Sequence, residues 1–263
     1  MNILFIGDIV GRPGRRSVAR WLPRLRDEFA VDLVIANGEN AAGGLGITPA
    51  LVRELLEGGV QVITLGNHTW RKREFVKAIG SFDAVVRPAN YPEGVPGKGF
   101  VAYRLDDGRT VGVVNLLGRV YMEPVLCPFA VGSRVVEELR QATPVVIVDM
   151  HAEATSEKVA MGWHLDGKCT AVIGTHTHVQ TADERVLPGG TAYITDVGMT
   201  GPLDSVIGVE RDLILRRFLT GMPVEFEVAA GRPALAAVVV DADDETGKAR
   251  SIRRLLREDP DNE

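Results

Sequence analysis

Short apolar runs alternate with polar, glycine-containing turns through the first half of the chain. The runs at residues 3–6, 33–36 and 60–65 have the length and the branched side chains of buried strands. Each run is followed by a stretch with helical spacing. Strands that alternate with helices predict βαβ units and a mostly parallel sheet that is covered on both faces.

The stretches after these runs carry helix signals. Apolar residues recur at helical spacing between residues 18 and 29, where Pro23 predicts a kink or a shortened helix. Thr48 and Pro49 have the pattern of an N-cap followed by proline at the first helical position. A third helix is expected over residues 70–79.

After residue 99 the pattern changes. Residues 99–117 predict a hairpin with its turn at Asp107-Gly108, and residues 132–141 predict a helix. Further strands are expected at 145–148, 171–173, 186–187, 192–195, 224–228 and 235–240, with a strand or short helix at 251–256 and a polar end at 258–263. No linker separates the two halves, so we expect one domain over residues 1–263 to which each half contributes a sheet.

Composition narrows the classes of partner. The formal net charge is -5 with both signs interspersed, which argues against duplex DNA and against a membrane surface as partners. Small anionic substrates stay compatible with it, because bound metal ions can outweigh the global charge. The N-terminus resembles a strand rather than a signal peptide, and only Cys127 and Cys169 are present. We therefore expect a cytoplasmic protein with reduced thiols.

Five apolar runs end in side chains that suit metal binding. In open α/β sheets ligands bind beyond the carboxyl ends of the strands, so these groups are expected to converge on one crevice. Four of the chain's five histidines follow strands in this way. The polar groups are Asp8, Glu39, Asn40, Asn67, His68, His151, His176 and His178. Their joint occurrence predicts a metal site.

Taken singly, most of these residues have a simpler explanation. Asp8 could cap the next helix, and Glu39-Asn40 could be ordinary turn residues. A lone His151 is more often hydrogen-bonded in a core than bound to metal. His176 and His178 are harder to dismiss, because residues two apart in an extended segment point the same way.

The motifs resemble those of a known family. GD at 7–8, GEN at 38–40, GNH at 66–68 and GTHTH at 174–178, with His151 at a strand end, resemble the calcineurin-like metallophosphoesterases. The longer segments GDIVGRPG, NGENAAGG, LGNHTW and TDVGMTGP resemble the YmdB-like bacterial branch. The resemblance implies a four-layer α/β/β/α sandwich with two mixed sheets and a two-metal site.

The resemblance also implies a ligand set. Glu39 would bridge two metals, Asp8 and His178 would hold one of them, and Asn67, His151 and His176 the other. The superfamily usually carries DxH where this chain has Asp8 and Val10, so one imidazole is missing. The amide oxygen of Asn40 is expected to fill that position. Mixed nitrogen and oxygen ligands suit iron, manganese, zinc or cobalt, and we expect iron or manganese.

The expected activity is hydrolysis of a phosphodiester or phosphomonoester. Two cations about 3.5–4 Å apart can clamp phosphate oxygens and hold a bridging hydroxide for in-line attack. The resemblance favours small nucleotide esters such as 2′,3′-cyclic nucleotides. His68 is expected to protonate the leaving oxygen or to stabilise charge, and the alternative is that it only orients Asn67.

Two other functions stay open. The missing DxH histidine leaves room for a metal-binding regulatory protein with little turnover. An amide hydrolase is disfavoured, because the HxH pair follows four other strand-end ligands. The sequence decides neither the oligomeric state, with a homo-oligomer left open, nor whether residues 118–131, which include Arg119 and Tyr121, form a lid.

Overall fold

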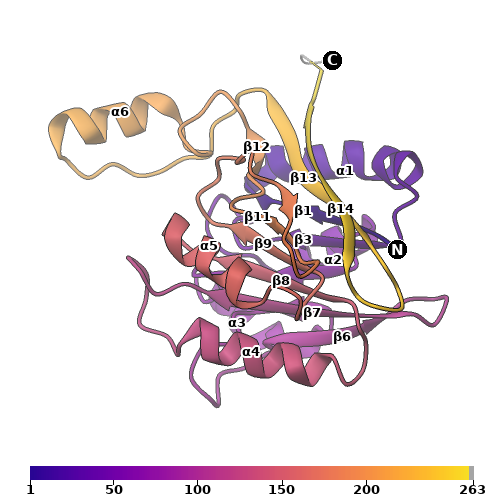
Figure 1. Ribbon diagram of the computed structural model, residues 1–263. Coiled ribbons are helices and arrows are strands. Elements are labelled where there is room, and N and C mark those ends of the chain that lie inside the picture. Colours follow the sequence, from indigo (N-terminus) through magenta and orange to yellow (C-terminus); the bar gives the residue numbers. More distant parts are fainter. Residues whose placement is uncertain (261–263) are drawn as a thin grey trace.

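The computed structural model describes residues 1–260, and its strands form two mixed sheets that pack face to face (Figure 1). Residues 261–263 of the expected polar end lie outside the described part. The first sheet has the order β2-β12-β13-β1-β3-β4-β5, with β14 beside β13. Its strands are β1 (Asn2–Ile6), β2 (Asp8–Ile9), β3 (Leu33–Asn37), β4 (Val62–Thr64), β5 (Val85–Val86), β12 (Met199–Pro202), β13 (Pro233–Ala242) and β14 (Ala249–Glu258).

The second sheet has the order β10-β11-β9-β8-β7-β6. Its four central strands are parallel, and the two edge strands run antiparallel to their neighbours. The strands are β6 (Phe100–Arg104), β7 (Thr110–Leu117), β8 (Val146–His151), β9 (Ala171–Thr175), β10 (Arg185–Val186) and β11 (Ala192–Ile194). The hairpin expected over residues 99–117 is confirmed as β6 and β7.

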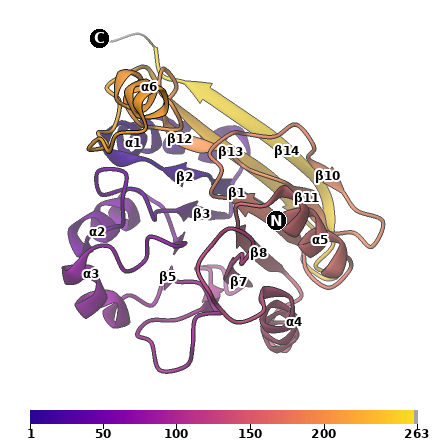
Figure 2. The same cartoon turned by 90° about the vertical axis from the view of Figure 1, so that its left-hand side faces the viewer.

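Helices cover the outer face of each sheet (Figure 2). Helices α1 (Gly11–Glu28), α2 (Pro49–Glu57) and α3 (Arg73–Ala78), with the 3-10 turn Ile79–Ser81, pack on the first sheet, and α4 (Pro128–Leu139) and α5 (Thr155–His164) pack on the second. Between the sheets lies a core that includes Phe5, Ile35 and Val238 of the first sheet and Ile147 and Ile173 of the second. The four-layer α/β/β/α sandwich with two mixed sheets is therefore confirmed.

This shared core bears on the domain count. Residues from both ends of the chain meet in it, because β13 pairs with β1 over the register from Asn2 to Ile6. Burial of a side chain such as Phe5 contributes about 1.5–3 kcal/mol. Such a core favours one folding unit over the chain, and the single domain stays a prediction.

The structure corrects several element boundaries. Residues 224–228 do not form a strand and make only an isolated bridge, between Val209 and Val228. Helix α4 begins at Pro128 rather than at Gly132, because proline serves as its first residue, and α3 begins at Arg73 rather than at Trp70. Pro23 lies inside an uninterrupted 18-residue α1.

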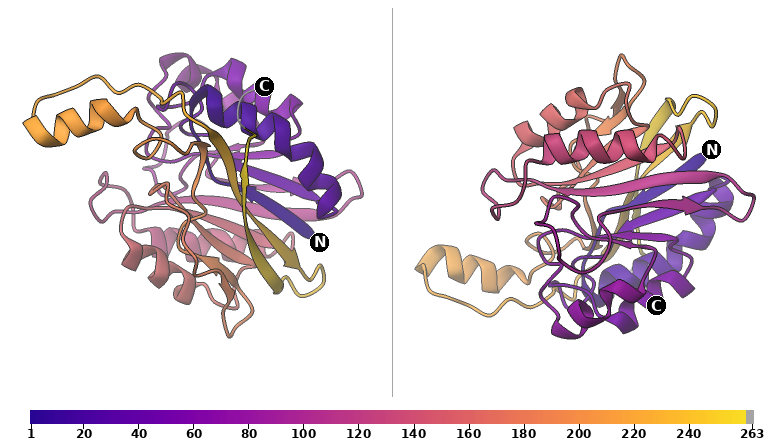
Figure 3. Two further views of the ribbon diagram at one scale, coloured as in Figure 1. Left: turned by 90° about the horizontal axis from the view of Figure 1, so that it is seen from above. Right: turned by 90° about the horizontal axis from the view of Figure 1, so that it is seen from below.

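One helix was not anticipated at all. Helix α6 (Arg211–Thr220) projects from the body of the molecule (Figure 3), and Ile214 is its only buried residue. Helical spacing needs a buried face to be visible in sequence, and α6 hardly has one. Within residues 1–260, no helix combines the length and the apolar character needed to cross a membrane.

Candidate metal centre

Strand ends from both sheets meet at one edge of the sandwich. Asp8 follows β1, Glu39 and Asn40 follow β3, and Asn67 and His68 follow β4, all in the first sheet. In the second sheet His151 ends β8, and His176 and His178 follow β9. The structure brings all eight predicted residues into one connected cluster, as the carboxyl ends of parallel strands allow.

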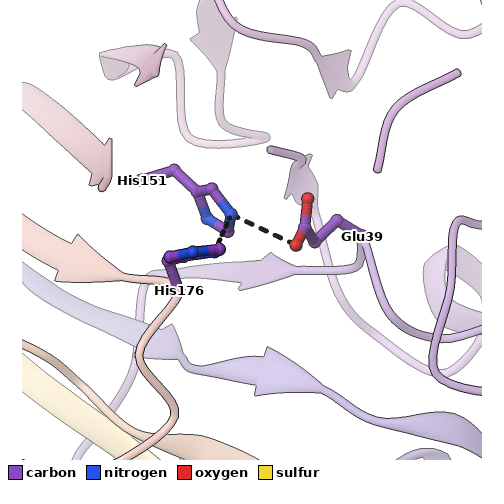
Figure 4. A group of neighbouring side chains, drawn as sticks. All are labelled: Glu39, His151 and His176. Atoms are coloured by element: carbon purple, nitrogen blue, oxygen red, sulfur yellow. Dashed lines mark hydrogen bonds and ion pairs between the residues drawn. The ribbon is translucent and has the colours of Figure 1, made fainter. Parts of the chain in front are cut away.

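Glu39, His151 and His176 form the centre of this cluster, and their side chains point toward one another (Figure 4). His151 Nε2 lies 3.1 Å from Glu39 Oε1 and 3.1 Å from His176 Nδ1. Asn67 Oδ1 is also 3.1 Å from His151 Nε2. One ligand atom from each of the three residues in Figure 4 falls within 4.8 Å of the others, which is the compactness that a shared cation requires.

Asp8, Asn40 and His178 lie on the other side of Glu39. Asn40 Nδ2 is 3.3 Å from Glu39 Oε1 and 3.2 Å from His178 Nε2, and His178 Nε2 is 3.9 Å from Asp8 Oδ1. Glu39 thus lies between two groups of potential ligands. This is the position that a bridging carboxylate would occupy.

Two observations test whether these residues fit metal ions. Within the described residues, Asp8 Oδ1 is buried and has no hydrogen-bond partner, which is costly for a carboxylate unless a cation or a proton compensates it. A Cβ atom added to Gly66 would lie 2.3 Å from His151 Nε2 and 2.4 Å from Glu39 Oε2. The backbone therefore approaches these side chains as closely as glycine alone permits. The donor set fits transition-metal ions.

The buried side of His151 is fixed by hydrogen bonds. Its Nδ1 lies 2.8 Å from Thr175 Oγ1, and that hydroxyl donates its proton to Asp149 Oδ1. The Thr175 oxygen is therefore left to accept from Nδ1–H, and Nε2 is the ring nitrogen that faces Glu39 and can bind a cation. Asn37 supports the same network, because its amide donates to Asp149 and its Oδ1 accepts from the backbone N–H of Glu39. Partners of this kind orient a metal-binding imidazole.

The backbone of the histidine pair is strained. His176 has φ 95° and His178 has φ 65°, both in the left-handed region that non-glycine residues rarely adopt. The prediction that the pair lies in an extended segment is therefore wrong, although both imidazoles do reach the cluster. The side chains converge through a tight turn rather than through strand geometry.

A buried ion pair holds this turn. Lys158 Nζ donates to Asp196 Oδ2 at 2.7 Å, and the same oxygen accepts from the backbone N–H and the hydroxyl of Thr177. Both charged side chains are almost completely buried. Asp196 thereby fixes the residue between the two histidines.

Burial and mutual charge shift the pKa values in the cluster. Burial raises the pKa of Asp8. Burial would also raise the pKa of Glu39, but His151 and His68 outweigh it and hold that pKa well below its usual value. For His151, burial opposes the charged form, yet Glu39 and Asp8 raise the pKa to about 9. Burial, aided by His151, lowers the pKa of His176 to about 3. A cation at His151 Nε2 therefore competes with a proton.

His68 lies at the boundary between the cluster and solvent. Its backbone N–H donates to Glu39 Oε2 at 2.9 Å, and its Nδ1 is 2.6 Å from Asn40 Oδ1. Its side chain is 19% exposed and lines the pocket above the cluster. An imidazole in this position can reach a bound ligand, whereas the buried His151 has no such access.

The pocket above the cluster measures about 390 Å³. Gly43 and Gly44 line it, and Gly46 does not. Residues 118–131 contribute nothing to its lining, so Arg119 and Tyr121 cover no part of the site as described. The other lining residues are Val10, Glu39, Asn40, Leu45, His68, Glu153, His176, Thr177, His178, Ile207, Gly208, Val209, Phe226, Glu227 and Val228.

The fold and the ligand geometry together define the class. A four-layer sandwich whose strand-end carboxylates, amides and imidazoles surround a central Glu39 is a calcineurin-like metallophosphoesterase. A family model described as YmdB-like protein matches residues 4–255, and the chain belongs to this YmdB-like family.

Relatives agree over almost the full length. The chain is 50% identical over 259 residues to the 2′,3′-cyclic-nucleotide 2′-phosphodiesterase of Bacillus subtilis, with 98% of both chains covered. A solved structure of a hypothetical protein from Thermus thermophilus has a TM-score of 0.92 and 45% identity, covering 99% of this chain and all of that one. A novel phosphatase from Mycoplasma pneumoniae has a TM-score of 0.91 and 36% identity, covering 99% of this chain and 95% of that one.

Proposed function

We propose that this chain is a metal-dependent phosphodiesterase that hydrolyses small nucleotide esters, with 2′,3′-cyclic nucleotides as its substrates. The observation that carries the proposal is the convergence of two ligand groups on Glu39 from the two sheets. The Bacillus subtilis relative, named for activity on this class of ester, supports the choice of substrate.

The proposed ligands divide around Glu39. The first group is Asn67, His151 and His176, and the second is Asp8, Asn40 and His178, with Glu39 shared. When bound, two cations supply positive charge for the phosphate oxygens and lower the pKa of water to give a nucleophile. We propose iron or manganese, and zinc or cobalt is compatible with the same donors.

Asn40 requires one rotation to act as a ligand. Its Nδ2 now faces Glu39 Oε1 and His178 Nε2, while its Oδ1 faces His68 Nδ1. A 180° rotation of the amide exchanges the two atoms and turns the oxygen toward the groups that would share a cation with it. Asn40 Nδ2 would then donate to His68 Nδ1, so that the proton of a neutral His68 would reside on Nε2.

That proton gives His68 its role. Attack on phosphorus by an oxygen nucleophile forms one P–O bond and breaks the bond to the ribose 2′ oxygen. Negative charge develops on the leaving oxygen, which takes its proton from water, and His68 is the lining imidazole outside the proposed ligand set whose Nε2–H can donate a hydrogen bond to that oxygen. Asn40 orients the ring, and His68 in turn holds Glu39 through its backbone N–H.

The comparisons give no support to the regulatory alternative, since the relatives with a named function are named as enzymes. We place the protein in the cytoplasm, because Cys127 and Cys169 are both free thiols. We also propose a homo-oligomer, supported by the exposed Leu215, Phe218 and Leu219 on the projecting α6. Sedimentation velocity would show a monomer if this last proposal is wrong.

Purified protein with quantified metal content, assayed on a panel of 2′,3′-cyclic nucleotides and on bis-p-nitrophenyl phosphate, tests the main proposal. We expect turnover of both kinds of diester, and the product from the cyclic substrates should be the nucleoside 3′-phosphate. Protein that contains two metals per chain and is inert on every ester would overturn the enzymatic function.

A further inference from the structure

We infer that the pocket carries a nucleobase-binding subsite, formed by an apolar wall of Leu45, Ile207, Val209, Phe226 and Val228 beside the proposed metal ligands. The inference rests on the proposed function and adds to it the means by which the non-reacting part of the substrate is held. Its volume of about 390 Å³ lies in the range of about 300–1,000 Å³ typical of small-molecule pockets.

The pocket lining combines two kinds of chemistry. Glu39, Asn40, His68, His176 and His178 supply polar groups beside which the phosphate would react. A phosphate group alone makes no use of the branched and aromatic side chains of the wall. A substrate that fills the pocket therefore presents an apolar, flat portion beside its phosphate, and in a cyclic nucleotide that portion is the base.

Phe226 is the ring suited to stacking. Its side chain is 44% exposed, and the guanidinium carbon of Arg217 lies 4.9 Å from the ring centroid. Arg217 therefore covers one face of the ring and leaves the other to the pocket that Phe226 lines. Ile207 and Leu45, which are 52% and 44% exposed, flank the same space. Burial of these apolar surfaces by a base would stabilise the complex.

The wall is tied to the metal centre. His178 Nδ1 donates to the carbonyl oxygen of Ile207 at 2.9 Å, so the position of this ligand and that of the wall are coupled. Ile207 itself has φ 47°, a strained conformation held by the surrounding loop. A base bound at the wall would therefore lie at a fixed offset from the reacting phosphate.

The wall is also formed before a ligand binds. Gly208 is confined by Val10 and Met199, since an added Cβ would lie 2.9 Å from Val10 Cγ1 and 3.0 Å from Met199 Sδ. The backbone N–H of Ala229 donates to Gly208 at 3.0 Å, and that of Glu210 donates to Glu227 at 2.9 Å. The two segments of the wall thus brace each other, which reduces the entropy lost on binding.

Stacking does not read the edge of a base. Every base has a π face, so a ring of this kind accepts all four bases and favours the larger purines. We therefore expect the enzyme to accept all four 2′,3′-cyclic nucleotides, with a lower KM for the purine ones.

The test compares Phe226→Ala with Phe226→Tyr and with Phe218→Ala, a matched loss of a ring that is 79% exposed on α6 and does not line the pocket. The substrates are adenosine 2′,3′-cyclic phosphate and methyl β-riboside 2′,3′-cyclic phosphate, which has the same ester and no base. For Phe226→Ala we expect KM for the adenosine substrate to rise about tenfold with kcat nearly unchanged. With the base-free substrate, Phe226→Ala should have the KM and kcat of the wild type. Phe226→Tyr and Phe218→Ala should match the wild type on both substrates.

Binding of adenosine 3′-phosphate and of ribose 3-phosphate by calorimetry provides a readout that does not need turnover. Phe226→Ala should raise the Kd for adenosine 3′-phosphate about tenfold and leave the Kd for ribose 3-phosphate unchanged. Equal effects on the two ligands, or no effect on either, would overturn the subsite. Failure of the metal-loaded wild-type protein to hydrolyse either cyclic ester would instead count against the proposed function, whatever Phe226 does.

Discussion

Glu39 lies between two sets of potential ligands and has no exposed surface. Glu39→Gln keeps the size of the side chain and removes the charge that we propose holds two cations together. We expect loss of metal from both positions, with affinity falling at least about 100-fold, and loss of turnover. Metal analysis after dialysis measures this. Glu54→Gln, an exposed carboxylate paired with Arg15, is the control and should keep both metals. Two tightly held metals in Glu39→Gln would show that Glu39 is not the bridge.

His68 separates the two interpretations that the sequence left open. Its imidazole lines the pocket and contacts Asn40. His68→Ala should retain both metals and turn over about 100-fold more slowly, because loss of one hydrogen-bond donor to developing charge costs about 10²–10³-fold. Steady-state kinetics on a 2′,3′-cyclic nucleotide give the rate. Loss of metal together with activity would assign His68 a role in orienting ligands instead.

Thr175 acts on the site through His151. Thr175→Val keeps the shape of the side chain but leaves His151 Nδ1 without its acceptor at 2.8 Å. Metal affinity should fall about 10- to 100-fold, measured by competition with a chelator. Thr170→Val, directly before β9, removes the bond that the hydroxyl donates to the Gly247 carbonyl oxygen and the one that it accepts from the Val146 N–H. This control should lower stability by about 1–3 kcal/mol and leave metal affinity unchanged.

The sequence predicted which residues come together in the site, but not the hydrogen bonds and backbone conformations that hold them there. Each of the eight side chains follows an apolar run, and parallel strands bring their carboxyl ends together. Asp149 was visible as a charged residue in a buried strand, but its bonds to Thr175 and Asn37 join segments that are far apart in sequence. The left-handed backbone of His176 and His178 has no local signal either, because neither is glycine.

At the scale of elements, the turn after β4 packs its backbone directly against two of the proposed metal ligands. An alanine at Gly66 would place its Cβ against His151 and Glu39. Gly66→Ala should therefore displace both side chains, abolish metal binding and cost about 1–3 kcal/mol of stability. Gly80→Ala has no atom within 4 Å of the new Cβ and should be neutral. Metal content and thermal unfolding measured on both variants test this, and normal metal content in Gly66→Ala would contradict it.

Elements with a buried face were predictable, and those without one were not. Strands β1, β3, β8 and β9 and helices α1 and α2 all show their periodicity in sequence. Residues 224–228 alternate like a strand, but only Val228 finds a bridge partner. Helix α6 shows the opposite discrepancy: the segment is helical, but large apolar side chains such as Phe218 are exposed instead of packed on the core. In both cases the pattern reflects something other than the core of this chain.

At the scale of the molecule, the metal centre joins two sheets that otherwise meet only through apolar packing and a few polar contacts. Metal binding to the folded state should therefore raise stability by about 2.7 kcal/mol at a concentration 100-fold above Kd. For a chain of this size that corresponds to about 5–10 °C in Tm. Calorimetry with and without a chelator measures the shift, and Glu39→Gln should show none. An unchanged wild-type Tm would mean that no metal binds preferentially to the folded state.

Strand β13 gives the fold a consequence for its biosynthesis. It lies between β12 and β1, and β12 in turn pairs with the strand that begins at Asp8. Residues 233–242 follow all eight site residues in the sequence, so β1 waits with an open edge after those eight residues have been made. Assembly of the proposed metal centre is therefore tied to the synthesis of β13. Before that strand is added, the nascent polypeptide offers a cation only scattered donors, and metal loading follows the pairing of β13.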